Sequence, residues 1–108
     1  MKVIQGKHKG TILKGFDING TRPTMDRVKE SLFAMIQNGI YNKSCLDLFA
    51  GSGNLGIEAL SMQAKQVVFV DHNQTAIKTI KENLSKVHEQ AKVINLDYQK
   101  ALNYFYQN

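Results

Sequence analysis

A glycine-rich bend between two apolar runs constrains this chain most strongly. Residues 45–50 read as a short strand, and Gly51, Gly53 and Gly56 follow in the pattern G-x-G-x-x-G. A helical pattern comes next, and a second apolar run then ends at Asp71. This order is typical of nucleotide-binding units, in which glycines let the backbone approach a ligand. A turn that merely needs glycine is the simpler alternative, but it does not account for the acid.

The rest of the chain continues to alternate strands with helices. Thr24 is a plausible N-cap for an early helix that ends near residues 38–39. We predict further helices at about residues 54–62, 76–87 and from Gln99 onward, and strands at 66–70 and 92–96. Strands that alternate with helices imply right-handed crossovers and a parallel sheet. The predicted fold class is therefore α/β.

All three strand regions carry an acid at or near their ends: Asp47, Asp71 and Asp97. Ligands of open α/β sheets bind outside these carboxyl ends, so the acids bear on the choice of cofactor. A carboxylate at Asp47 would repel the pyrophosphate of NAD but attract the cationic groups of S-adenosylmethionine. Asp71 suits ribose hydroxyls in both cases. The charges favour S-adenosylmethionine, and an NAD-dependent oxidoreductase is the less favoured alternative.

Length and charge set further bounds. The chain has 108 residues, no long apolar run and no signal-like N-terminus, which indicates a cytoplasmic protein. Cys45 is its only cysteine, so no intrachain disulfide is expected. The formal net charge of +5 is concentrated in the first 30 residues. Residues 1–20 read as a basic β-hairpin, with strands at 2–5 and 11–13, followed by a turn. Residues 21–108 read as a Rossmann-like half-domain. The hairpin tip (Lys7, His8 and Lys9) and Arg22 are candidate RNA contacts, although a solvated basic face is an equal alternative.

Two segments resemble the bacterial small-subunit ribosomal RNA guanine-N2 methyltransferases (the RsmD family). They are residues 21–33, TRPTMDRVKESLF, and 47–61, DLFAGSGNLGIEALS; residues 3–10, VIQGKHKG, are similar to that family's opening hairpin. The resemblance implies a class I methyltransferase fold, S-adenosyl-L-methionine as methyl donor, and guanine of ribosomal RNA as acceptor. It also implies a role at the cofactor for six residues, with Asp71 at the ribose and Asp97 at the adenine: Asp47, Phe49, Gly51, Gly53, Asp71 and Asp97.

Three departures qualify the resemblance. Residues 61–64 are Ser-Met-Gln-Ala where the family usually has Ser-Arg-Gly-Ala, and Asp71 stands where glutamate is frequent. More importantly, the family's catalytic Asp-Pro-Pro-Tyr or Asp-Pro-Pro-Phe motif has no counterpart, because Pro23 is the only proline. We therefore expect the catalytic motif to lie beyond Asn108, so that no catalytic residue is assigned within the chain.

The missing motif leads to two expectations and one alternative. We expect the cofactor-binding part of an enzyme, inactive by itself. The strand at residues 46–49 would then form an exposed edge that favours self-association. A non-catalytic fragment that binds S-adenosylmethionine or RNA is the main alternative.

Overall fold

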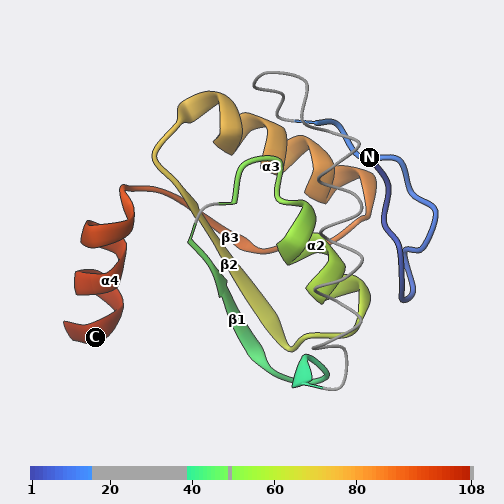
Figure 1. Cartoon of the computed structure of the whole chain (residues 1–108), viewed down its shortest axis with the longest axis horizontal. Helices are drawn as coiled ribbons and strands as arrows, with labels where there is room; N and C mark the ends of the chain where they lie inside the picture. Colours follow the sequence, from blue (N-terminus) through green and yellow to red (C-terminus); the bar gives the residue numbers. More distant parts are fainter. Residues whose placement is uncertain (16–38, 49, 108) are drawn as a thin grey trace.

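Three parallel strands form the sheet in the computed structural model, which describes residues 1–15, 39–48 and 50–107. The strands are β1 (Ser44–Asp47), β2 (Gln66–Asp71) and β3 (Lys92–Asn95), and they lie side by side in the order β1-β2-β3. The connecting helices are α2 (Asn54–Ser61) and α3 (Gln74–Lys86), and α4 (Tyr98–Gln107) follows β3 (Figure 1). The α/β class with a parallel sheet is confirmed.

The register explains which side chains enter the main core. Cys45 pairs with Val67, and Phe69 pairs with both Asp47 and Val93, so these residues share one face of the sheet. Phe69 is fully buried on that face beneath α2 and α3. Ile57 of α2 and Ile80 of α3 are also fully buried, and both belong to the same apolar cluster. Both helices therefore cover one face of the sheet, as two right-handed crossovers require.

α4 lies apart from the other two helices and contacts β2 (Figure 1). Its residue Ala101 is fully buried. Asp97 caps this helix: its Oδ1 accepts from the amide of Lys100 at 2.9 Å, and its carbonyl oxygen accepts from Ala101 at 3.0 Å. α4 therefore begins one residue before the predicted Gln99.

The N-terminal hairpin packs onto the α/β unit through the same core. Val3 and Leu13 are almost completely buried within the apolar cluster. The predicted strands pair only at one antiparallel bridge, between Lys2 and Ile12, and backbone hydrogen bonds such as Val3 to Thr11 close the rest of the turn. Much of the hairpin backbone instead bonds to α2, as described below, which explains why the ladder is short.

The first strand is shorter than predicted. It was expected at residues 45–50, but β1 ends at Asp47 and residue 48 already belongs to the following turn. At the end of α2, Gln63 has a φ of 67° in the left-handed region, and the next amide, of Ala64, donates to Ala59 at 3.0 Å. Gln63 thus performs the role that glycine usually has at a helix end. The predicted early helix and the predicted turn that follows the hairpin lie outside the described residues.

Candidate cofactor site

The glycine loop turns sharply from β1 into α2. Gly51 and Gly53 have φ values of 56° and 82°, which side chains rarely tolerate. The amide of Gly53 donates to the carbonyl of Ala50 at 2.7 Å, and the amide of Ala50 donates to the carbonyl of Val70 at 3.0 Å. These bonds hold the loop beside the carboxyl end of β2.

The second and third glycines also permit close packing. A Cβ added to Gly53 would lie 3.2 Å from the side chain of Ile80, and one added to Gly56 would lie 2.2 Å from the ring of Phe69. Gly56 therefore lets α2 rest directly on the buried ring of β2. The three glycines thus serve different purposes, which is the division of roles expected of a nucleotide-binding loop.

Asp71 ties the loop to the end of β2. Its Oδ2 accepts from the amide of Gly51 at 3.0 Å, and its Oδ1 accepts from the amide of Asn73 at 2.9 Å. The side chain is only 12% exposed, and His72 Nδ1 lies 3.7 Å from Oδ1. Each carboxylate oxygen can accept a second hydrogen bond. The side chain can thus fix the loop and still accept from a hydroxyl of a bound ligand.

Two further predicted acids lie at the same end of the sheet. Asp47 ends β1 with its Oδ2 buried, next to the start of the glycine loop. Asp97 is exposed two residues beyond β3 and caps α4. Asn95, which the sequence analysis did not single out, ends β3 and donates from Nδ2 to the carbonyl of Asp71 at 3.1 Å. The carboxyl ends of β2 and β3 are therefore linked by a side chain that no local pattern reveals.

Two of the three predicted RNA residues at the hairpin tip contact one carboxylate. Lys7 Nζ and His8 Nε2 lie 3.0 Å and 2.6 Å from Oε2 of Glu89, just beyond α3. Partial burial raises the pKa of Glu89, but the hydrogen bonds from His8 and Lys7 outweigh it and hold that pKa below its ordinary value. Lys9 is exposed at the tip. Two of the predicted RNA contacts thus already bind an acid.

Three residues on which the functional predictions depend lie outside the described residues. Phe49 is a predicted cofactor residue, Arg22 is a predicted RNA contact, and Asn108 is the residue beyond which the catalytic motif is expected. The roles of Phe49 and Arg22 therefore stay predictions. The expectation of a catalytic motif beyond Asn108 likewise stays a prediction, and no catalytic residue is assigned among residues 1–15, 39–48 and 50–107.

Three buried polar residues position the N-terminal segment. Glu58 of α2 is fully buried and accepts from the amides of Ile4 and Gln5 at 2.8 and 3.3 Å. Ser61, also on α2, accepts from the amide of His8 at 2.9 Å, and its hydroxyl donates to a carbonyl oxygen of the hairpin. Asn83 of α3 donates to the carbonyl oxygens of Lys14 and Ser52 at 2.8 and 2.9 Å. Asn83 therefore links the N-terminal segment to the glycine loop.

The sequence analysis missed these three residues. Glu58 and Ser61 are spaced to share one face of a helix, which was the available signal. Their partners are 53–56 residues away, and no local pattern identifies them.

Other chemistry finds no support among the residues that the structure describes. These contain no group of three or more potential metal-binding side chains, and no helix among them is long and apolar enough to cross a membrane. Burial raises the pKa of the Cys45 thiol, which disfavours the reactive thiolate. The glycine loop and its neighbouring acids are therefore the best-defined candidate site.

Fold and loop together define a Rossmann-like α/β unit of the class I methyltransferase type, with an incomplete sheet. Among solved structures, the Escherichia coli protein yhhF superposes with a TM-score of 0.82 at 35% identity, over 94% of this chain and 56% of that one. The profile of the family described as conserved hypothetical protein 95 matches residues 1–108, so the chain belongs to this family. The resemblance noted from the sequence is confirmed.

Two curated relatives are similar to this chain over most of its length. The ribosomal RNA small subunit methyltransferase D of Haemophilus influenzae is 45% identical over 106 residues, which cover 93% of this chain and 55% of the relative. The Bacillus subtilis protein YlbH is 47% identical over 104 residues, 94% of this chain and 56% of the relative. The chain thus spans a little over half the length of these curated relatives.

Proposed function

We propose that this chain forms the S-adenosylmethionine-binding part of a methyltransferase that acts on guanine N2 of small-subunit ribosomal RNA. The observation that carries the proposal is the double role open to Asp71. This carboxylate fixes Gly51 and keeps acceptor capacity beside a glycine loop with positive φ values. The name of the Haemophilus relative supports the ribosomal substrate. Such a substrate would place the activity in the cytoplasm, as the sequence predicts.

The residues present fit S-adenosylmethionine better than a dinucleotide. Residues 48–53 carry no charged side chain, and acids flank them at Asp47 and Asp71. This surplus of negative charge favours a ligand with a sulfonium and an ammonium over one with a pyrophosphate. Asp71 would accept from the ribose hydroxyls, the glycine loop would approach the ligand through its backbone, and Asp97 would face the adenine.

When bound, S-adenosylmethionine supplies an electrophilic methyl group. The chain's own contribution is to bind and orient the donor, because the Asp-Pro-Pro-aromatic motif that would hold the acceptor nitrogen is absent from its sequence. We therefore expect the 108 residues to bind the donor without methylating RNA by themselves.

Calorimetric titration tests the proposal directly. The chain should bind S-adenosylmethionine and not NAD, since only the former matches the negative site. Equal affinity for both cofactors, or binding of NAD alone, would overturn the assignment and favour the oxidoreductase alternative. A parallel assay with labelled methyl groups and small-subunit ribosomal RNA should show no turnover. Turnover would mean that catalytic residues lie within this sequence after all.

The basic hairpin remains part of the proposed RNA contact. The Lys7 side chain is half exposed and its ammonium has three donors, so it can contact phosphate while it stays paired with Glu89, and Lys9 is exposed at the tip. In a full-length relative, replacing the residues equivalent to Lys7 and Lys9 with alanine should reduce the salt dependence of RNA affinity. An unchanged dependence would assign both lysines to an ordinary solvated face.

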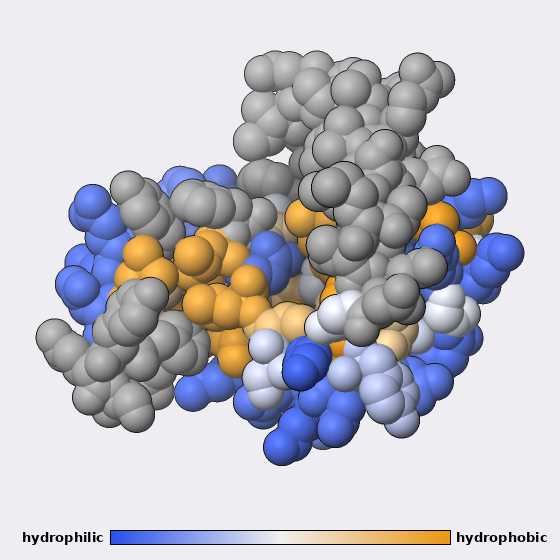
Figure 2. Space-filling model, turned by 60° about the horizontal axis from the view of Figure 1, so that its bottom comes forward, coloured by the Kyte–Doolittle hydropathy of each residue, from blue (hydrophilic) through white to orange (hydrophobic). Residues whose placement is uncertain are grey.

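Self-association through β1 is a further part of the proposal. Within the described sheet β1 is an edge strand, and Leu46 on it is 41% exposed. Apolar side chains reach the surface on the side of the molecule where β1 runs (Figure 2). Unprotected apolar edges pair with other strands, so light scattering should detect dimers or larger species. A strictly monomeric chain would show that this edge is covered.

A further inference from the structure

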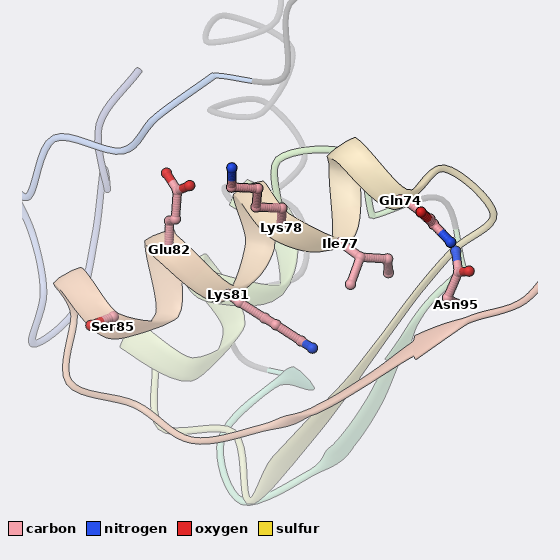
Figure 3. A pocket seen from close by; sticks show the side chains of 7 residues that line it. All are labelled: Gln74, Ile77, Lys78, Lys81, Glu82, Ser85 and Asn95. Carbon is pink, nitrogen blue, oxygen red and sulfur yellow. The ribbon is translucent and has the colours of Figure 1, made fainter.

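A groove runs along α3 on the side where β3 forms the other edge of the described sheet. It has a volume of about 650 Å³, and Figure 3 shows Gln74 and Asn95 together at one end, with Ile77 and Lys81 directed into the space between α3 and β3. A second hollow of about 310 Å³ continues it and shares Lys81 and Ser85. The groove begins beside the proposed cofactor site, because Asn95 donates to the carbonyl of Asp71.

Charge along this groove is unbalanced. Its two carboxylates are matched by basic residues of the N-terminal segment: Lys14 lies 3.2 Å from Glu82, and Lys7 and His8 contact Glu89. Lys78 and Lys81 form no ion pair within the part of the chain that the structure describes. The N-terminal segment thus neutralises the acids and leaves two α3 lysines as the net charge, Lys81 directed into the groove and Lys78 at its rim, directed away from β3 (Figure 3).

From this arrangement we propose that the groove between α3 and β3 binds the phosphate backbone of single-stranded RNA. Lysine ammonium groups are mobile point charges that contact phosphates without demanding one geometry. The described side chains that line the groove include no aromatic ring on which a base could stack, so the proposed contacts are to phosphates, which carry no sequence information. The amides of Gln74 and Asn95 supply donors and acceptors where the strand reaches the carboxyl edge. This inference rests on the proposed function, for which it names a substrate-binding surface distinct from the hairpin tip.

Fluorescence anisotropy with a short labelled single-stranded RNA, over a series of salt concentrations, tests the groove. The double variant Lys78→Gln/Lys81→Gln should bind more weakly. Its slope of log affinity against log salt should be shallower by about 1.4, because each phosphate contact on a single strand contributes about 0.7. All substitutions are on exposed side chains, and thermal melts would establish that the fold is retained.

The matched control is Lys65→Gln/Lys86→Gln, which removes the same charge from exposed positions outside the groove, one of them on the same helix. The control should keep most of the affinity and the slope. Equal losses of RNA affinity in the two double variants, or no RNA binding by the unaltered chain, would overturn the proposal that the groove binds RNA. Displacement of the RNA by poly-glutamate of equal charge would also do so, because it would reveal a surface for any polyanion.

The same variants separate this inference from the proposed function. Lys78→Gln/Lys81→Gln should bind S-adenosylmethionine as the unaltered chain does, since neither lysine belongs to the cofactor site. Loss of RNA binding in a chain that does not bind S-adenosylmethionine would support the groove and reject the methyltransferase assignment. If Lys78→Gln/Lys81→Gln binds S-adenosylmethionine normally and its RNA affinity is unchanged, the groove proposal is rejected and the proposed function is not.

Discussion

The glycine loop and the N-terminal hairpin are both fixed by acidic side chains that accept backbone amides, but over very different distances in the sequence. Asp71 holds Gly51 across 20 residues, within one strand–helix–strand unit. Glu58 holds Ile4 across 54 residues, between two separate parts of the chain. Asp71 keeps a partly exposed side chain at the edge of the sheet, whereas Glu58 is fully buried. The first arrangement suits a ligand site, and the second suits a structural anchor.

The largest expected effect comes from breaking the anchor. Glu58→Ala should lower the free energy of unfolding by about 2–4 kcal/mol, because the amides of Ile4 and Gln5 lose an acceptor. Urea denaturation measures the change. Glu82→Ala is the control: its pair with Lys14 is largely exposed, so it should cost less than about 1 kcal/mol. Similar losses in both variants would contradict the anchoring role of Glu58.

Filling the space between Gly56 and the ring of Phe69 should have the next largest effect on stability. Gly56→Ala places a methyl group 2.2 Å from the ring of Phe69, which must move, at a cost of about 1–3 kcal/mol. Helix propensity alone would favour alanine by about 1 kcal/mol, so the sign of the measured change is decisive. Gly39→Ala, where the added carbon meets nothing within 4 Å, should be almost neutral. Stabilisation by Gly56→Ala would show that α2 does not rest on β2 as described.

The hairpin's outer contact should have the smallest effect and depend on pH. The pKa of Glu89 is lowered in the folded chain, so its stabilisation is complete above the ordinary value of 4.5 and is lost as pH falls through the lower folded value. In Glu89→Gln this part of the acid sensitivity should disappear, a difference of about 0.5–1 kcal/mol. Thermal melts from neutral to acid pH measure it. Parallel curves for the variant and the unaltered chain would show that Glu89 does not contribute.

The same contrast explains what the sequence could predict. The loop and its acid lie within one local unit, so glycine spacing and apolar runs are sufficient to place β2, α2 and Asp71. The hairpin's attachment depends on Glu58, Ser61 and Asn83, whose partners are 31–69 residues away. Periodicity does not encode such pairings. The sequence analysis also did not predict that Glu89 contacts Lys7 and His8, because only the fold brings these two segments together.

The most direct test of the account is the affinity of Asp71→Ala for S-adenosylmethionine, measured by calorimetry beside the unaltered chain. Asp71 should serve both the loop and the ligand, so the variant should lose about 1–3 kcal/mol of binding free energy. Asp71→Asn keeps one oxygen acceptor but lacks the charge, so its affinity should lie between those of Asp71→Ala and the unaltered chain. Melting curves verify that both variants fold. Unchanged affinity in Asp71→Ala would contradict the claim that the carboxyl edge of this sheet binds the methyl donor.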